Sequence, residues 1–210
     1  MRYARSRMLF GADFDKIHNA KVLLLGVGGV GGFCLDCLFR SGVRDITIVD
    51  FDTFEESNQN RQLGSEALGE VKVEYFKRIY PSIMIHNIKV TPQWCETFDF
   101  SPYDLVIDAI DDMRAKVALT HFAGEKMIAS MGGAKRLDPT KIETCSIWKT
   151  HGDALAKKFR YELKKSGFKG DFEVVFSSEP PSCVEMGSFM GVTGSFGLAL
   201  CSLAIKKLIL

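Results

Sequence analysis

The stretch Val22-Leu23-Leu24-Leu25-Gly26-Val27-Gly28-Gly29-Val30-Gly31 decides how this chain folds. Four apolar residues that end in glycines are typical of a buried parallel strand followed by a tight turn. Residues 29–40 continue as a helix, which Ser41-Gly42 closes. In this strand–turn–helix context, glycines let a phosphate approach the free N–H groups at the helix N-terminus. The pattern therefore predicts a nucleotide-binding turn.

The rest of the chain continues the alternation of strand and helix. Strands are predicted at 46–50, 83–90, 105–110 and 127–131, helices at 66–80 and 113–123, and extended structure at 137–148. This order predicts an α/β fold with a Rossmann-like, doubly wound, mostly parallel sheet and a C-terminal extension. We expect residues 1–148 to form the core and residues 149–210 to complete the same domain.

Composition excludes several classes of protein. With 210 residues, 46% hydrophobic content and a net charge of +1, the chain can bury a core and is not disordered. Its six cysteines are irregularly spaced, unlike those of a secreted disulfide framework. Residues 1–12 contain no apolar signal core, so we expect a cytoplasmic protein.

An uncharged run of nineteen residues, from Gly187 to Ile205, is long enough to cross a membrane. It contains four glycines, three serines and a threonine, so its mean hydropathy is modest. Such small residues are also typical of helices that pack closely against a neighbour. We therefore favour a helix of the protein core or of a dimer interface over a membrane span.

Positive charge gathers between Lys149 and Lys169, where seven basic and two acidic residues give a local net charge of +5. The i, i+4, i+8 spacing of Leu155, Phe159 and Leu163 predicts a helix with one apolar stripe, which Asp153 can cap. A solvated face and a nucleic-acid-binding face fit this pattern equally well. The candidate nucleic-acid contacts are Lys135, Arg136, Lys157, Lys158, Arg160, Lys164 and Lys165.

Charged residues beyond the glycine turn argue against a plain dinucleotide site. Asp50 ends the second strand, where a carboxylate can accept hydrogen bonds from ribose hydroxyls. Arg61 and Lys72 follow, and such side chains neutralise phosphate oxygens. Asp111 comes after a later strand, where a carboxylate suits a magnesium ion carried by a nucleoside triphosphate. A nicotinamide dehydrogenase would leave these last three residues unexplained.

The chain resembles the adenylating core of the ubiquitin-activating-enzyme-like (ThiF/MoeB/HesA) superfamily. The matching motifs are Gly-x-Gly-Gly-x-Gly at 26–31, Asp50-x-Asp52, Asn58-x-x-Arg61-Gln62, Lys72 and Asp108-Ala-Ile-Asp111. Within this superfamily it is more similar to the tRNA threonylcarbamoyladenosine dehydratases, through 108–116, 132–134, 138–142, 149–157 and 175–179. This resemblance covers essentially the whole chain, but the stretch from 61 to 72 and the region after Phe176 are shorter than in the family pattern.

The resemblance implies an ATP-dependent enzyme that dehydrates and so cyclises N6-threonylcarbamoyladenosine at position 37 of tRNA, through an acyl-adenylate. It implies that the ATP-binding residues are Gly26, Gly28, Gly29, Gly31, Asp50, Asp52, Asn58, Arg61, Lys72 and Asp111. Three of these would be catalytic: Arg61 on the phosphate tail, Lys72 on the α-phosphate, and Asp111 as a ligand of Mg²⁺. A homodimer is also implied, and Arg61 is often supplied by the second subunit in this superfamily.

Two other functions fit parts of the pattern. The first is an adenylating activator of a ubiquitin-like sulfur-carrier protein. Such activators bind zinc through two Cys-x-x-Cys pairs, whereas the second half of this chain has only the unpaired Cys145, Cys183 and Cys201, so we expect no structural zinc. The second is a non-catalytic nucleotide-binding regulator, which would be expected to have lost at least one of the three catalytic candidates.

Overall fold

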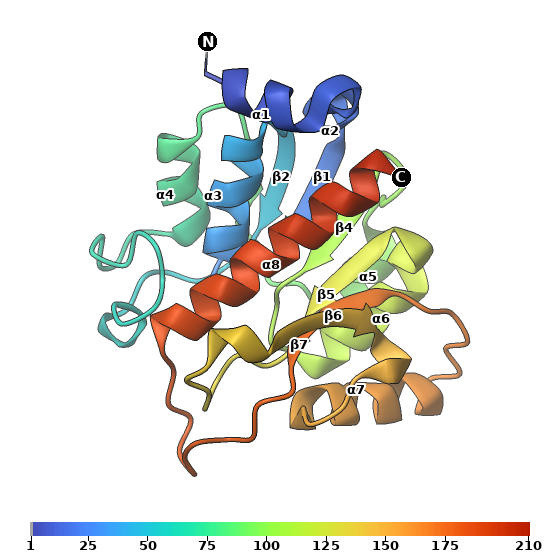
Figure 1. The fold of residues 1–210 in the computed structure, drawn as a ribbon. Coiled ribbons are helices and arrows are strands. Elements are labelled where there is room, and N and C mark those ends of the chain that lie inside the picture. Colours follow the sequence, from blue (N-terminus) through green and yellow to red (C-terminus); the bar gives the residue numbers. More distant parts are fainter. Residues whose placement is uncertain (1) are drawn as a thin grey trace.

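The computed structural model describes residues 2–210 as a seven-stranded sheet between two layers of helices (Figure 1). The strands are β1 (Lys21–Leu25), β2 (Asp45–Val49), β3 (Met84–His86), β4 (Leu105–Asp108), β5 (Met127–Ser130), β6 (Ile142–Ser146) and β7 (Glu173–Ser177). Their order is β3-β2-β1-β4-β5-β7-β6, and every neighbouring pair is parallel except β6 with β7. The predicted doubly wound, mostly parallel α/β class is confirmed.

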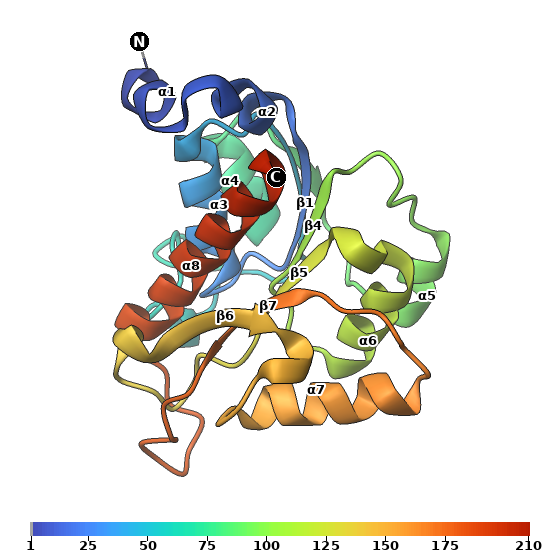
Figure 2. The ribbon, with the colours of Figure 1, turned by 45° about the vertical axis from the view of Figure 1, so that its right-hand side comes forward.

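Helices cover both faces of the sheet (Figure 2). On one face lie α3 (Gly31–Ser41), α4 (Lys72–Ile79) and α8 (Met190–Ile209); on the other lie α5 (Pro92–Thr97), α6 (Met113–Ala123) and α7 (Ala154–Lys165). Two short helices, α1 (Ala4–Phe10) and α2 (Phe14–Asn19), precede β1. Single 3-10 turns occupy Gly11–Asp13, Glu56–Asn58, Gly124–Lys126, Pro139–Lys141 and Ile147–Lys149.

Strand β1 explains why the sheet needs both helix layers. Val22 and Leu24 enter the core that contains α3, α4 and α8, whereas Leu23 and Leu25 enter the core that contains α5, α6 and α7. Successive side chains of a strand point to opposite faces, so an unbroken apolar strand must be covered on both sides. All four side chains are fully buried.

The C-terminal apolar run forms α8, which lies diagonally across the sheet and packs on α3 (Figure 1). By length and composition it is the one helix among the described residues that could cross a membrane, and 56% of its apolar window is buried in the protein. Gly197 allows the close approach, because a Cβ there would lie 2.4 Å from the Val30 carbonyl oxygen. The prediction of a helix in the core is confirmed.

Some element boundaries differ from those predicted. The helix expected at 66–80 begins only at Lys72, because Gly69 has a φ of 80° and Thr53 pairs with Val71 in an isolated bridge. The strand expected at 83–90 is only Met84–His86. Strand β7 and the helices α1, α2 and α5 were not predicted. Each is seven residues or fewer, so packing against the rest of the chain stabilises it more than its own sequence does.

Candidate nucleotide-binding site

Two glycines give the turn after β1 its shape. Gly26 has a φ of 85°, and a Cβ there would lie 2.8 Å from the Ala109 carbonyl oxygen. At Gly31, a Cβ would lie 1.9 Å from the carbonyl oxygen of Gly26. Such contacts exclude any side chain at either position, so the chain can turn here only with glycine. The turn leads directly into α3 at the carboxyl edge of the sheet.

The other two glycines face the segment between residues 57 and 62 of the same chain. A Cβ at Gly29 would lie 3.3 Å from Cγ of Arg61, and one at Gly28 would lie 3.7 Å from Nε2 of Gln62. Arg61 is held in place because its Nη1 donates to the Ser57 carbonyl oxygen and to Asn60 Oδ1, both at 2.8 Å. The fold thus places Arg61 beside the glycine turn of its own chain.

The Asp50 carboxylate ties the turn to the end of β2. Its Oδ2 accepts a hydrogen bond from the Val27 backbone N–H at 2.8 Å, and its Oδ1 accepts one from the Asp52 N–H at 2.9 Å. A carboxylate has about four acceptor positions. Asp50 can therefore hold the turn and still accept from a further hydroxyl.

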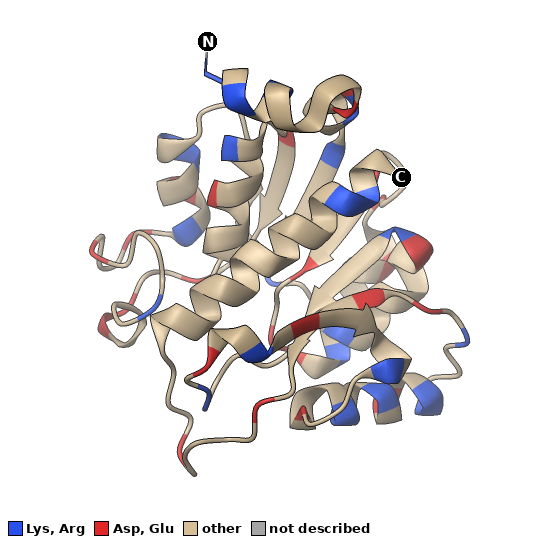
Figure 3. Cartoon of the chain, in the orientation of Figure 1, with Lys and Arg blue, Asp and Glu red and all other residues tan. Residues whose placement is uncertain are grey.

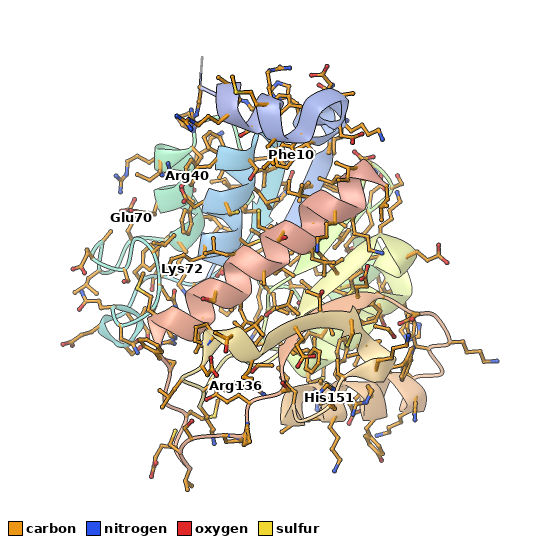
Figure 4. The ribbon with its side chains drawn as sticks, viewed as in Figure 1. Phe10, Arg40, Glu70, Lys72, Arg136 and His151 are labelled. Carbon is orange, nitrogen blue, oxygen red and sulfur yellow. The ribbon has the colours of Figure 1, made fainter. Side chains whose placement is uncertain are left out.

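Lys72 brings a buried positive charge to the same edge. It is the first residue of α4 (Figure 4), only 4% exposed, and its Nζ lies 3.1 Å from Asp52 Oδ2. The Asp52 side chain is itself 47% exposed. A buried charge needs a partner, and Asp52 supplies one. The Lys72 ammonium has three N–H donors, so it can still donate to a phosphate.

The predicted residue Asn58 has a different immediate role. Its side-chain Oδ1 accepts from the Glu55 N–H at 3.2 Å, and together they form a capping box over the 3-10 turn at Glu56–Asn58. Asn58 thereby fixes the start of the segment that carries Arg61. Asn58 itself is buried.

A buried ion pair shapes the edge beside β4, and the sequence prediction gave it no role. The side chains of Asp108 and Lys116 are both fully buried, and Lys116 Nζ lies 2.9 Å from Asp108 Oδ2. Lys116 Nζ also donates to the Ile110 carbonyl oxygen at 2.9 Å. Burial raises the pKa of Asp108, and the Lys116 ammonium opposes that shift. The signal for this pair in the sequence was Lys116, a charged residue between the apolar Ala115 and Val117.

Lys116 and Asp108 fix the short segment that presents Asp111. The Asp108 Oδ1 also accepts from the Ile110 N–H at 3.1 Å. Both the N–H and the carbonyl oxygen of Ile110 are therefore held by this pair. Asp111 comes next and is exposed to solvent. Within residues 2–210, no group of three or more His, Cys, Asp and Glu side chains could hold a metal ion by itself.

Four of the seven predicted nucleic-acid contacts lie exposed on α7, where the charge view shows a row of basic residues (Figure 3). They are Lys157, Lys158, Lys164 and Lys165. The Asp153 cap is confirmed, since its Oδ1 accepts from the Ala156 N–H at 2.9 Å.

Arg136 requires a correction. Its side chain is buried, its Nη2 lies 3.1 Å from Asp153 Oδ2, and its Nη1 donates to the Ser177 carbonyl oxygen. The guanidinium joins the end of β7 to the start of α7 and cannot reach a solvent-exposed phosphate. Lys135 and Arg160 also form hydrogen bonds within the protein. Lys135 Nζ donates to the Val184 carbonyl oxygen, and Arg160 Nη1 donates to the Thr150 hydroxyl.

The parallel sheet, the glycine turn at its carboxyl edge and the carboxylate at the end of β2 define a Rossmann-like nucleotide-binding protein. Arg61 and Lys72 add two cations to that edge. The ThiF family model matches residues 3–209, and the chain belongs to the ThiF family.

Several relatives are similar to this chain over most of its length. The chain is 36% identical to the tRNA threonylcarbamoyladenosine dehydratase of Bacillus subtilis, over 86% of this chain and 76% of that protein. The crystal structure of the Escherichia coli tRNA N6-threonylcarbamoyladenosine dehydratase in complex with ATP matches with a TM-score of 0.92 and 30% identity, over 99% of this chain and 93% of that one. The molybdopterin-synthase adenylyltransferase of Haemophilus influenzae is 28% identical, over 98% and 83% of the two chains.

Removing one partner of the buried pair should destabilise the protein strongly. Lys116→Met leaves the Asp108 carboxylate buried without a counter-charge, and we expect a loss of about 3–5 kcal/mol in the free energy of unfolding. The double variant Asp108→Leu/Lys116→Met should regain most of that loss, because no buried charge remains. Urea unfolding measures both. A double variant as unstable as Lys116→Met would contradict this role of the pair.

Proposed function

We propose that this chain is an ATP-dependent dehydratase that cyclises N6-threonylcarbamoyladenosine at position 37 of tRNA. The observation that carries the proposal is the position of Arg61 and Lys72 around the glycine turn, in a chain that resembles dehydratases over almost its full length. A turn that only bound a dinucleotide would not need both of these cations beside it.

The first step activates the threonyl carboxylate. One carboxylate oxygen attacks the α-phosphorus of ATP, the bond from that phosphorus to the bridging oxygen breaks, and pyrophosphate leaves. Catalysis of such transfers is mostly positioning and charge stabilisation. Lys72 stabilises the charge that develops on the α-phosphate, and Arg61 holds the phosphate tail.

The second step closes the ring. A nucleophilic atom of the neighbouring ureido group attacks the activated acyl carbon, loses its proton, and expels AMP. The net change is the loss of one water from the modified adenosine. Because both reacting groups belong to one side chain, no cysteine nucleophile is required.

Several contacts support ATP as the nucleotide. Gly28 and Gly29 leave the outer face of the turn free of side chains of their own, so backbone N–H groups can approach phosphates. Gln62 Oε1, next to Gly28, is buried without a hydrogen-bond partner among the described residues, and it fits a ligand that brings a hydroxyl or amino donor. Asp50, with acceptor capacity left, is proposed to accept from the ribose.

Mg²⁺ is proposed to enter with ATP. Asp111 is exposed three residues after the end of β4, and Mg²⁺ is typically held by one or two carboxylates together with phosphate oxygens and water. Bound there, the ion would neutralise phosphate charge. Residues Asp52 and Asn58 are proposed to act through their neighbours, since they hold Lys72 and the Arg61 segment.

The remaining assignments stay predictions. We propose that residues 1–148 form the adenylating core and that residues 149–210 complete the same domain. We also propose a homodimer in the cytoplasm. Because Arg61 lies against Gly29 of its own chain, we propose that it acts on the ATP bound to that chain rather than across a dimer interface.

The sulfur-carrier activator is the less supported alternative. It shares the ATP half-reaction, so the glycine turn alone does not separate the two functions. The greater identity to the dehydratases, 36% and 30% against 28%, favours the tRNA substrate.

Nucleoside mass spectrometry tests the proposal directly. The purified protein is incubated with ATP, Mg²⁺ and tRNA that carries the threonylcarbamoyl group, and the tRNA is then digested. We expect the modified adenosine to lose one water, with one AMP formed for each. An unchanged nucleoside, with ATP–pyrophosphate exchange that depends on a carrier protein, would refute the dehydratase in favour of the activator.

Arg61→Ala should lower kcat by about a hundredfold or more, because it removes a charge that stabilises the transition state. The fold should be unaffected, since among residues 2–210 the Arg61 guanidinium donates hydrogen bonds only within its own segment. Arg78→Ala is the matched control: Arg78 forms an exposed ion pair with Glu70 on the outside of α4, and its loss should leave kcat unchanged. Near-normal turnover of Arg61→Ala would show that the phosphate role is wrong.

A further inference from the structure

The outer face of α7 carries an exposed aromatic ring among its lysines. Tyr161 is 64% exposed, and Lys157, Lys158, Lys164 and Lys165 are exposed as well. These lysines lie three or four residues before and after Tyr161, and residues at those spacings are neighbours on a helix surface. At 3.6 residues per turn, the five side chains span an arc of about 120°, with Tyr161 at its centre.

The opposite face of α7 is used by the fold. Ala156, Phe159 and Leu163 are buried in the core beneath the sheet. Tyr161 is absent from that core, and its hydroxyl forms no hydrogen bond among residues 2–210. Its ring therefore contributes little to the packing of the protein.

The four lysines also lack acidic partners within the described part of the chain. None of them forms an ion pair there, whereas eight other lysine and arginine side chains do. Lys164 lies 6.0 Å from the centre of the Trp148 ring. Positive charges gathered on one helix face repel each other, and an anionic partner would relieve that repulsion.

An exposed aromatic ring surrounded by lysines matches the chemistry of unpaired RNA. Lysines attract the phosphates, while an aromatic face stacks on a base that is free of its own helix. A protein partner with acidic residues would satisfy the lysines, but it would leave the central ring without a matching surface.

We propose that Tyr161 stacks on an unpaired base of the bound RNA while the four surrounding lysines contact its phosphates. The proposal rests on the proposed function, because tRNA is the RNA in question. The start of α7 lies near the carboxyl edge of the sheet: a Cβ at Gly132, just after β5, would lie 3.5 Å from Cβ of Leu155. An RNA bound along α7 can therefore reach the nucleotide-binding edge.

Fluorescence anisotropy tests this with two labelled RNAs: a hairpin with an unpaired loop, and a fully paired duplex with the same number of phosphates. We expect Tyr161→Ala to weaken hairpin binding about fivefold or more, the lower end for loss of one stacked base, and to leave duplex binding unchanged. Tyr161→Phe keeps the ring and should bind like the unchanged protein. Lys157→Gln should instead weaken the binding of both RNAs. It should also make the slope of log K against log salt concentration shallower by about one.

Met84→Ala is the matched control for loss of an exposed apolar side chain. Met84 is 58% exposed and lies on β3, at the far end of the strand order from the strands next to α7, so its loss should leave both affinities unchanged. Equal hairpin affinity of Tyr161→Ala and the unchanged protein would overturn the proposal. The proposal would also be overturned if Tyr161→Ala changed the sedimentation coefficient of the protein but not its RNA affinity. That result would make the face a protein interface.

The dehydration assay separates this inference from the proposed function. If the unchanged protein dehydrates its substrate but Tyr161→Ala binds the hairpin normally, the stacking role is wrong and the function stands. If Tyr161→Ala loses hairpin affinity while the unchanged protein dehydrates nothing, the stacking role stands and the dehydratase function is wrong. Under both proposals together, Tyr161→Ala should raise KM for tRNA and leave kcat near normal.

Discussion

The nucleotide-binding edge depends on the hydrogen bonds of one carboxylate. Asp50, at the end of β2, accepts from the Val27 N–H in the glycine turn and from the Asp52 N–H two residues on. The backbone carbonyl oxygen of Asp52 in turn accepts from the Lys72 N–H at 3.0 Å, and the Asp52 carboxylate pairs with the Lys72 ammonium. A continuous chain of contacts therefore links the turn after β1 to the first residue of α4. Asp50 thus helps to fix the turn relative to Lys72, together with the backbone hydrogen bond from the Gly26 N–H to the Val49 carbonyl oxygen.

Two buried ion pairs extend this edge beyond the glycine turn. Asp108 with Lys116 fixes the residues before Asp111, and Arg136 with Asp153 joins the end of β7 to the start of α7. Burying charges is costly unless they are paired and hydrogen-bonded, as both pairs are. They also set the geometry of the residues beside them. Both pairs lie at the carboxyl ends of strands, where the ligands of open α/β sheets bind.

Much of this arrangement could be predicted from the sequence, because strong local signals mark it. The apolar run before Gly26 and the glycines after it specify β1, the turn and α3. The Asp153 cap and the apolar stripe that follows it specify α7. The short elements could not be predicted in this way. Strand β7 has five residues, and its place between β5 and β6 is set by pairing with strands distant in sequence. The same limit explains Arg136, whose partner Asp153 lies on another element.

The position of the charged residues in this chain is more informative than their total. The net charge of +1 conceals the basic segment from Lys149 to Lys169, and the sequence alone left its face either solvated or bound to nucleic acid. The structure separates its members: four lysines lie exposed on one face of α7, and Arg160 bonds to Thr150. The face that remains is smaller and better defined than the segment, with an aromatic ring at its centre.

The central claim is that this edge transfers the adenylyl group of ATP to a carboxylate. It is tested most directly with tRNA whose threonylcarbamoyl carboxylate is labelled with oxygen-18. Attack of that carboxylate on the α-phosphorus carries one labelled oxygen into the AMP released when the ring closes. We expect labelled AMP and unlabelled pyrophosphate by mass spectrometry. Cyclised product accompanied by unlabelled AMP, or by ADP and labelled inorganic phosphate, would contradict it.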